Sequence, residues 1–371
     1  MKNKTEIRIS RNSLLGTLLK AARVASNKSF ILFEVKGGIL TVKANNHETQ
    51  IEASVNPDGQ PSDVAFCMDD SIISMLKLLP EQPLAITVTE EKEEKITRIN
   101  VRIVHDSGTA NFPAFPAGEY AEIKHGDGEA FSIPAKKLKM GLGKTRKFTD
   151  KNELRPVMMA VYLDITQDGI TFVGTDTYAM SVFKDKSLTG ISARGIIINT
   201  DAVNDIVALL DNSDSDMAVI SSGDKVITVA FGDTVISIRA IEGRYPNYNS
   251  IIPANNTIRC TLDSEGVSAA ANRILTVSDL LYKEIRIAVA DGEVRLSGGN
   301  EGLSRRAEEK MPAQCEGSIE IKTRITHLKA AMSIITGNAV LSFSDPARPV
   351  LISPEINEED TELLVLVMPV K

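Results

Sequence analysis

The chain has 371 residues, of which 43% are apolar and 5% are aromatic, and it contains no tryptophan. A chain of this length exceeds what one hydrophobic core supports, so we expect two or three domains with aliphatic cores. The net charge of −7 argues against a protein that binds nucleic acid over its whole surface, although it leaves room for a localised basic face.

The composition also bears on the compartment. No apolar run approaches the length of a membrane-spanning helix, and the polar, basic segment 1–11 lacks the apolar core of an export signal. The three cysteines, Cys67, Cys260 and Cys315, are scattered along the sequence and form no close pair. We therefore expect neither a disulfide nor a zinc site, and a reducing cytoplasm as the location.

The predicted elements follow one order that occurs three times. The first pass starts with an amphipathic helix over 11–26 and has a second helix over 69–79, which Pro80 ends. The segment 112–116 (FPAFP) closes this unit. The strands of this first pass are expected at 29–35, 39–43, 48–55, 84–89, 97–104 and around Thr109.

The second and third passes repeat this order. Helices are expected at 134–148 and 201–210, the latter capped by Thr200 or Asp201, and at 264–277 and 323–335. Strands of the second pass are expected at 157–164, 169–174, 178–183, 217–221, 225–231 and 234–241. Strands of the third pass are expected at 284–290, 293–298, 303–311, 340–344, 350–353 and 363–368.

Equivalent turns make the period visible at Gly38, Gly169 and Gly292. A period of roughly 120 to 130 residues is that of a repeated domain and not of a solenoid. The fold class that follows is α+β, with three tandem copies of a domain made of two helices and antiparallel strands. We expect domains at 1–125, 126–255 and 256–371. Two chains would give six like domains, which suits a ring.

One polar and aromatic segment, 241–253 (IEGRYPNYNSIIP), follows the second copy. Pro246 and Pro253 end regular structure at both sides of it. The segment is too polar for a core strand and too apolar for a free loop. It is either a linker pinned by Tyr245 and Tyr248 or part of the wall of a groove.

Several motifs point to catalysis or metal binding only weakly. Gly141-Leu142-Gly143-Lys144-Thr145 lacks the first glycine and the preceding strand of a phosphate-binding loop. The run 211–216 (DNSDSD) lacks the glycine and closing glutamate of a calcium loop. The four histidines show no metal-ligand spacing and lie in no known nucleophile motif. These patterns indicate a protein that is not an enzyme and needs no cofactor.

Positive charge gathers on the predicted helices. The run 134–147 holds six basic residues and no acidic one, and the first 28 residues are similarly basic. If these helices share one face, that face suits a phosphate backbone and does not read bases. The residues expected to face DNA are Lys20, Arg23, Lys28, Lys136, Lys137, Lys139, Lys144, Arg146, Lys147 and Arg324.

Three stretches resemble a known family. Residues 175–180 (TDTYAM) resemble its T-D-G-H-R-L, residues 242–248 (EGRYPNY) its D-G-R-F-P-D-Y, and residues 367–370 (VMPV) its V-M-P-M. In order and spacing, and over the whole length, the chain is similar to the bacterial DNA polymerase III beta subunits, the sliding clamps. The resemblance implies a head-to-tail homodimeric ring around double-stranded DNA, with no sequence specificity and no catalysis.

The resemblance also implies a groove at the second and third domains that binds short peptides. Replicative polymerase, clamp loader and repair proteins carry such peptides. By position, the groove would contain Met158, Thr175, Thr177, Tyr178, Met180, Pro246, Ser250, Ile251, Pro349, Leu366, Met368 and Val370. Methionines and aliphatic side chains make an adaptable apolar socket, and the hydroxyls of Thr175 and Ser250 could fix polar atoms of the peptide.

For the dimer contact, the resemblance points to Ile274 and Leu275, which would meet the strand around Thr109 of the other chain. Two other functions stay open from the residues alone. One is an enzyme acting on nucleotides or nucleic acid, suggested only by the basic run and the Gly141–Thr145 stretch. The other is a peptide-binding scaffold that does not encircle DNA.

Overall fold

The structure is a computed structural model that describes residues 2–25, 30–93, 96–279, 281–290 and 292–370. These residues form two compact units, one made of residues 1–136 and 205–240 and the other of residues 137–204 and 241–371. Among the described residues, no helix combines the length and apolar character needed to cross a membrane.

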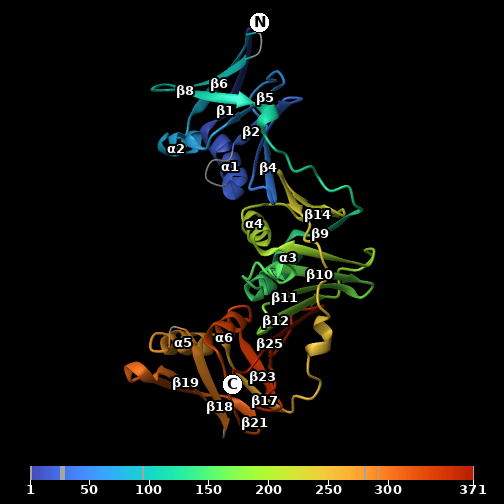
Figure 1. The fold of residues 1–371 in the computed structure, drawn as a ribbon, viewed down its shortest axis with the longest axis vertical. Coiled ribbons are helices and arrows are strands. Elements are labelled where there is room, and N and C mark those ends of the chain that lie inside the picture. The colour runs from blue at the N-terminus through green and yellow to red at the C-terminus, as the bar shows by residue number, and fades with distance from the viewer. Residues whose placement is uncertain (1, 26–29, 94–95, 280, 291, 371) are drawn as a thin grey trace. The chain divides into compact units, whose positions relative to one another are not determined.

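A strand, a helix and three further strands occur in this order six times along the chain (Figure 1). The first half of the chain contains β1 (Lys2–Ser10), α1 (Arg11–Ala21), β2 (Ile31–Lys36), β3 (Ile39–Asn45), β4 (Thr49–Val55), β5 (Val64–Met68), α2 (Ser71–Leu78), β6 (Pro83–Glu93), β7 (Ile96–His105), β8 (Gly108–Pro116), β9 (Ala130–Pro134), α3 (Ala135–Thr145), β10 (Ala160–Thr166), β11 (Gly169–Thr175) and β12 (Ala179–Asp185).

The second half repeats the motif, with one extra short strand, β21. It contains β13 (Arg194–Asn199), α4 (Thr200–Leu210), β14 (Met217–Ser222), β15 (Val226–Phe231), β16 (Thr234–Arg239), β17 (Ile258–Asp263), α5 (Ser264–Leu275), β18 (Glu284–Ala290), β19 (Glu293–Asn300), β20 (Arg305–Pro312), β21 (Gln314–Glu316), β22 (Ile319–Arg324), α6 (Ile325–Met332), β23 (Asn338–Phe343), β24 (Val350–Pro354) and β25 (Thr361–Val367). Short 3₁₀ turns are η1 (Ala22–Val24), η2 (Ala117–Glu119), η3 (Arg146–Phe148), η4 (Pro156–Met158), η5 (Tyr248–Ile251) and η6 (Glu301–Leu303).

Consecutive motifs pair by exchanging their first strands. The first strand of each odd motif pairs with the second strand of the next motif, as in β1–β6, β9–β14 and β17–β23. The first strand of each even motif pairs back onto the previous motif, as in β5–β2, β13–β10 and β22–β18. Among the described residues this exchange of strands occurs three times, once in each successive pair of motifs.

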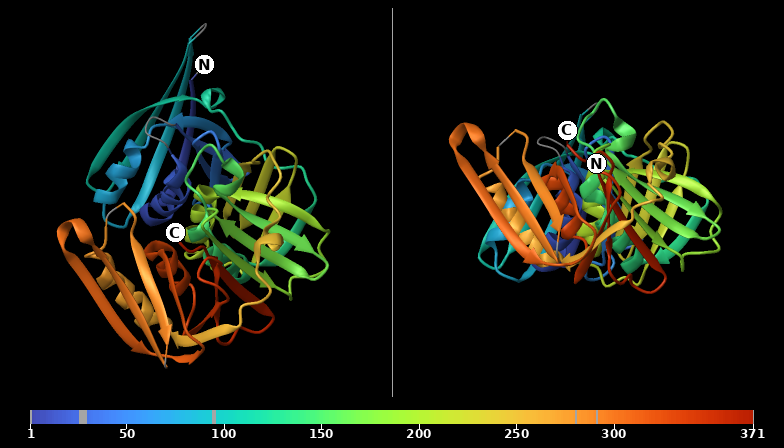
Figure 2. Two further views of the ribbon diagram at one scale, coloured as in Figure 1. Left: turned by 60° about the horizontal axis from the view of Figure 1, so that its bottom comes forward. Right: turned by 90° about the horizontal axis from the view of Figure 1, so that it is seen from below.

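Two pairings between the last strands of different motifs extend the sheets beyond one pair of motifs; we call each such pairing a joint. β4 pairs with β16, and the result is a 12-stranded sheet. β12 pairs with β25, and the result is a 9-stranded sheet. β18–β20 and β22 form a separate 4-stranded sheet, with α5 packed against it (Figure 2). Helices α5 and α6 lie side by side, as do α1 and α2.

The helices begin at polar caps and bury one apolar face. The side chain of Ser10 accepts the N–H of Ser13 at the start of α1, and Leu14 and Leu18 are fully buried below it. For α4 the expected cap at Thr200 or Asp201 is wrong, because the side chain of Asn199 accepts the N–H of Ala202 at 2.7 Å.

The Gly141–Thr145 stretch lies inside α3, where its glycine serves packing. A Cβ on Gly141 would come within 2.5 Å of the ring of Phe172, so only glycine lets this helix approach β11 so closely. The structure thus explains this glycine without a phosphate.

Several expected boundaries are wrong at the junction of a strand with a helix. Thr323 and Arg324 belong to β22, and α6 starts at Ile325. The segment 112–116, which was expected to close the first repeat, forms the end of β8, the last strand of that repeat. The first strand of each motif was not expected from the sequence, nor was the short strand β21; the missed first strands are β1, β5, β9, β13, β17 and β22.

Two cysteines that are far apart in the sequence meet across a pair of strands. Cys260 on β17 stands directly opposite Cys315 on β21.

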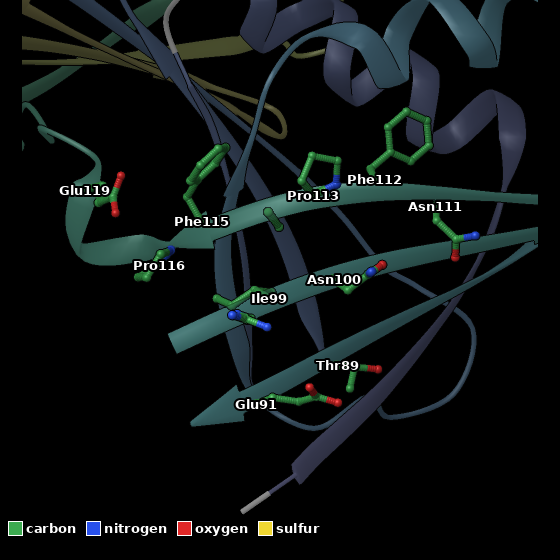
Figure 3. A pocket seen from close by; sticks show the side chains of 12 residues that line it. Thr89, Glu91, Ile99, Asn100, Asn111, Phe112, Pro113, Phe115, Pro116 and Glu119 are labelled. Atoms are coloured by element: carbon green, nitrogen blue, oxygen red, sulfur yellow. The ribbon is translucent and has the colours of Figure 1, made fainter. Parts of the chain in front are cut away.

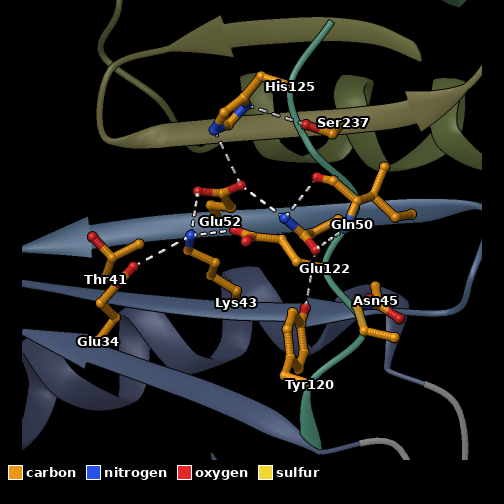
Figure 4. A network of polar contacts seen from close by, with 12 residues as sticks. Glu34, Thr41, Lys43, Asn45, Gln50, Glu52, Tyr120, Glu122, His125 and Ser237 are labelled. Carbon is orange, nitrogen blue, oxygen red and sulfur yellow. Dashed lines mark hydrogen bonds and ion pairs between the residues drawn. The ribbon is translucent and has the colours of Figure 1, made fainter. Parts of the chain in front are cut away.

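A buried lysine holds down the segment that connects β8 to β9 (Figure 4). The side chain of Lys43 is 11% exposed, and its ammonium lies 2.6 Å from Glu122 of that segment, 3.3 Å from Glu34 and 3.6 Å from Glu52. Burial alone would lower the pKa of Lys43, but the bond to Glu122 and the charges of the three carboxylates outweigh it, and the pKa is raised. Gln50 adds bonds to both backbone groups of Ile123.

Candidate functional site

The turn between β11 and β12 displays one aromatic side chain. The carboxylate of Asp176 accepts the N–H groups of Tyr178 and Ala179 at 2.9 and 2.7 Å. The hydroxyl of Thr175 donates to the carbonyl of Ala179, and Thr177 adopts a left-handed φ of 76°. These bonds fix a tight turn that leaves Tyr178 51% exposed.

A contact between a histidine and a carboxylate ties this turn to α6. Nε2 of His327 lies 2.8 Å from the second carboxylate oxygen of Asp176. Burial alone would raise the pKa of Asp176, but the bond and charge of His327 and the two backbone N–H groups outweigh it and lower the pKa. Nδ1 of His327 is buried and has no hydrogen-bond partner among the described residues.

The C-terminal tail docks beside the same turn. The N–H of Met368 donates to the carbonyl of Tyr178 at 2.8 Å, which continues the pairing of β25 with β12. The hydroxyl of Thr323 donates to the carbonyl of Met368, and the N–H of Val370 donates to the carbonyl of Lys322 at 2.8 Å. The tail therefore lies between the turn and β22.

Tyrosines of the segment 241–253 form the floor. Tyr245 stacks on Tyr162 with ring centroids 4.6 Å apart, and Tyr248 meets Tyr162 edge-on. Tyr245 and Tyr248 form one buried cluster with Val173, Met180 and Leu366, and Met368 packs against it. Burial raises the pKa of Tyr245 and of Tyr248 well above the ordinary value, so both remain neutral. Both tyrosines thus anchor the segment 241–253, and the same segment forms part of the site. The linker and groove interpretations of this segment are therefore compatible.

A cation lies over the exposed tyrosine. The guanidinium carbon of Arg324 is 4.4 Å from the centroid of the Tyr178 ring. This arrangement is a cation–π contact at the surface of the site. The structure therefore places Arg324, which was expected to face DNA, in the neighbourhood of the candidate groove.

The twelve expected groove residues fall into two groups in the second unit. Met180, Leu366 and Thr175 are buried and form the base. The others are at least partly exposed: Met158, Thr177, Tyr178, Pro246, Ser250, Ile251, Pro349, Met368 and Val370. Within the second group, Ile251 is a large apolar side chain that is 52% exposed, about as much as Tyr178. Pro349 directly precedes Val350, which pairs with Val367 at the end of β25.

The two hydroxyls that were expected to hold a peptide have partners within the chain. Thr175 donates to the carbonyl of Ala179, and Ser250 donates to the carbonyl of Asn247 at 2.7 Å. Their donated bonds shape the turn and η5, so only their lone pairs stay available to a ligand.

Several of the basic residues already have acidic partners. Lys20 lies 2.6 Å from Asp233, Arg23 3.1 Å from Asp205, and Lys137 3.2 Å from Asp185. Lys136 and Lys147 are exposed, Lys139 and Arg146 partly so. Lys28 lies outside the described residues.

One of these lysines is drawn inward. The ammonium of Lys144 donates to the carbonyl of Ile334, and burial lowers its pKa in spite of the charge of Glu358. It therefore contacts the end of the α6 region and contributes less to an open basic face.

The residues expected at a dimer contact lie in different environments. Thr109 is on β8, whose edge from 108 to 114 has no partner strand among the described residues. Ile274, on α5, is fully buried, whereas Leu275 at the end of the same helix is partly exposed. Only Leu275 of these two reaches the surface in this structure.

A hollow of about 880 Å³ lies along β8 in the first unit. Figure 3 shows Phe112, Pro113 and Phe115 on β8 along one side of it, with Asn100 and Ile99 on β7 next to them. It combines apolar walls with the carboxylates of Glu91 and Glu119, and none of the expected site residues line it.

Sequence reasoning missed the pairs that hold the site together. Tyr162, His327 and Asp176 were not proposed as site residues. His327 was considered only as a metal ligand, and among the described residues no group of three His, Cys, Asp or Glu side chains could hold a metal. The local signal for Asp176 was its place in a Thr-Asp-Thr turn, which is typical of side-chain-to-backbone capping.

Comparison with known proteins identifies relatives of the chain. Two sequence models of the DNA polymerase III beta subunit match the chain, that of the central domain over residues 132–247 and that of the C-terminal domain over residues 249–371. The beta sliding clamp of Synechococcus elongatus is 25% identical over 365 residues, which cover 96% of this chain and 92% of the relative. That of Treponema pallidum is 24% identical over 383 residues, or 99% of both proteins.

The fold has close structural counterparts as well. A DnaN sliding clamp (DNA polymerase III subunit beta) from Pseudomonas aeruginosa, crystallised with griselimycin, superimposes with a TM-score of 0.90 at 19% identity over 100% of both chains. A DNA polymerase III beta subunit from Thermotoga maritima gives 0.87 at 17% identity over 99% of both. The expected α+β fold of tandem copies is confirmed.

Proposed function

The chain belongs to the family of bacterial DNA polymerase III beta subunits, the beta sliding clamps, and we propose that two copies join head to tail into a ring of six domains around double-stranded DNA. In this role it is a DNA sliding clamp, a non-catalytic subunit that tethers the replicative polymerase to its template. We place its domains at 1–125, 126–255 and 256–371, and the protein in the cytoplasm.

The pairing of last strands carries this proposal. Each internal joint links the last strand of an odd motif to the last strand of the even motif that ends the next domain, as in β4–β16 and β12–β25. This rule leaves two last strands over, β20 at the edge of its sheet and β8 with a largely uncovered edge. They complete the rule only when β20 of one chain pairs with β8 of another, so each chain needs a partner at both ends.

The joint can be tested with one substitution on β8. Proline is tolerated in an edge strand where its missing N–H faces away from the sheet, as Pro113 shows. Thr109 lies four positions earlier and shares that orientation. Thr109→Pro should therefore block the outer edge and keep the bonds to β7, whereas Thr109→Val keeps both.

Light scattering over a range of concentrations gives the outcome. We expect a mass of twice 40.2 kDa for the unchanged chain and for Thr109→Val, and 40.2 kDa for Thr109→Pro with an unchanged circular dichroism spectrum. A Thr109→Pro dimer as tight as the parent would contradict this joint. A parent chain that stays monomeric at all concentrations would refute the ring and favour a peptide-binding scaffold.

The charge of the helices supports contact with DNA. The stretch 135–147 along α3 and η3 carries six cations and no acid. Because Lys20, Arg23 and Lys137 are each bonded to a carboxylate, the net positive charge is modest. Weak, screened contacts of this kind hold a backbone without fixing a position on it, which suits a ring that slides.

The site around Tyr178 supports peptide binding. We propose that polymerase, clamp loader and repair proteins each insert a short apolar peptide over the floor of Tyr245, Met180 and Leu366. The exposed Tyr178 and Ile251 would contact it first, and Arg324 would stiffen Tyr178 from the side. Thioether and aromatic surfaces adapt to more than one peptide.

Removal of the C-terminal tail tests this assignment. Deleting residues 368–371 removes the strand continuation beside Tyr178 and should abolish binding of a clamp-binding peptide while the dimer mass is kept. Tyr178→Ala should weaken the peptide by about 1–3 kcal/mol if the ring is a hot spot. Unchanged affinity in both variants would place the peptide elsewhere.

A further inference from the structure

Two cysteines that are distant in sequence stand side by side at the edge of the nine-stranded sheet. Cys260 on β17 is the direct antiparallel partner of Cys315 on β21. Directly opposite residues of such a pair have Cα atoms about 4.5–5.5 Å apart, inside the range of about 4.4–6.8 Å that a disulfide requires. Both thiols are free.

The two thiols differ in access. Cys260 is fully buried, and burial raises the pKa of its thiol, so it reacts poorly with a reagent from solution. Cys315 is partly exposed, on a strand of three residues that forms the edge of the sheet. An oxidant therefore reaches Cys315 first, and Cys260 lies next to it as the second thiol.

We propose that Cys260 and Cys315 are a redox-modification site that a peroxide converts into a reversible disulfide. In the first step the Cys315 sulfur attacks the peroxide, an S–O bond forms, the O–O bond breaks, and water leaves. In the second step Cys260 attacks the Cys315 sulfur, the S–S bond forms, and the hydroxyl leaves as water with the proton of Cys260. Two thiols and one hydrogen peroxide yield one disulfide and two waters.

The bond closes a long loop of the chain. Residues 260 to 315 include α5 and the strands β18–β20, so oxidation ties both ends of this segment to one edge of the sheet. Cross-linking lowers the conformational freedom of the unfolded chain. We expect the oxidised protein to unfold at a higher temperature than the reduced one, without a change of fold.

Thiol counting on the full-length protein tests the proposal. Reduced protein is exposed to hydrogen peroxide, the peroxide is removed with catalase, and free thiols are alkylated in denaturant and counted by intact mass. The number of alkylated thiols should fall from three to one, and dithiothreitol before alkylation should restore three. The remaining thiol should be Cys67, which is buried opposite Leu32 and Phe115 and serves as the internal control.

A variant separates the two steps. In Cys260→Ala the sulfenic acid on Cys315 has no second thiol and should accumulate, so that dimedone labels Cys315 strongly, whereas the parent chain labels weakly. Equal dimedone labelling of the two proteins would overturn the proposal. It would also be overturned if peroxide oxidises Cys315 in Cys260→Ala but leaves three alkylatable thiols in the parent chain. The thiol count on the parent needs no variant, so the test holds even if Cys260→Ala folds poorly.

Discussion

Replacing Lys43 with methionine should release the segment that connects β8 to β9. The lysine is the one cation shown among Glu34, Glu52 and Glu122 in that network (Figure 4). Methionine keeps the length and apolar stem of the side chain but removes the charge. The carboxylates of Glu34 and Glu52 then repel that of Glu122 on the segment.

The magnitude follows from which carboxylate is stranded. Glu34 and Glu122 are 36% and 40% exposed and can take up water, but Glu52 is only 9% exposed. Removing one partner of a buried ion pair costs about 3–5 kcal/mol, and because Glu52 keeps a hydrogen bond from the amide of Gln50 at 2.8 Å, the cost here lies at the lower end, about 3 kcal/mol. When the segment detaches, water reaches Glu52. The free-energy cost of removing Lys43 therefore destabilises only the state in which the segment is docked. The open population should rise roughly 100-fold.

Trypsin reports this opening directly, because Lys124 lies inside the segment. When opening is fast compared with cleavage, the cleavage rate follows the open population. We expect the fragment that ends at Lys124 to appear roughly 100-fold faster in Lys43→Met. The matched control is Lys36→Met, at the exposed end of β2, which should leave the rate unchanged.

A second substitution and a pH series check the electrostatic cause. Adding Glu52→Gln to Lys43→Met should recover most of the protection, because no buried charge remains. The pKa of Lys43 is raised by folding, so its contribution is full below the unfolded value of about 10.4 and is lost as pH rises through the higher folded value. Cleavage in Lys43→Met no faster than in Lys36→Met would refute this account.

Two more predictions concern single side chains in the second unit. Gly141→Ala should lower the free energy of unfolding by about 1–3 kcal/mol, because the new Cβ clashes with Phe172. Gly143→Ala should raise it by about 0.5–1 kcal/mol, because no described atom lies within 4 Å of the new Cβ. Equal effects of the two substitutions in urea unfolding would contradict the packing role of Gly141. Folding lowers the pKa of Asp176, so its contribution to stability is present above the unfolded pKa of about 3.9 and is lost as pH falls through the folded pKa. Asp176→Asn should therefore reduce the loss of stability at acid pH. An unchanged pH profile of stability would exclude the contact of Asp176 with His327 as its source.

The sequence revealed the three-fold period but not the six-fold one. The missed strands run straight into helices, as β1 ends at Ser10 and α1 begins at Arg11, and β17 ends at Asp263 where α5 follows. No glycine or proline marks these junctions, and the capping residue is itself the last residue of the strand. The pattern of apolar residues then merges strand and helix, and the prediction loses the first strand of every motif.

The candidate site was predictable where it is local. The Thr175–Ala179 turn and the tyrosines of 241–253 carry their own signals in short stretches of sequence. The contact of Arg324 with Tyr178 and the bond of His327 to Asp176 join segments about 150 residues apart, and they exist because β25 brings the third domain against β12. The same holds for Cys260 and Cys315, since only the register of β17 on β21 makes them neighbours.

The joint between chains should be the weakest of the three. The internal joints pair five residues in β4–β16 and seven in β12–β25, without a proline on either strand. On β8 the free edge starts at Gly108, and Pro113 removes an outward N–H from it, so a partner strand gains regular bonds only over residues 108–112. The ladder between subunits is then no longer than that of β4–β16, and the two internal joints are in addition held by the covalent chain. Opening of the ring should therefore begin where β20 leaves β8, with the domains of each chain still joined.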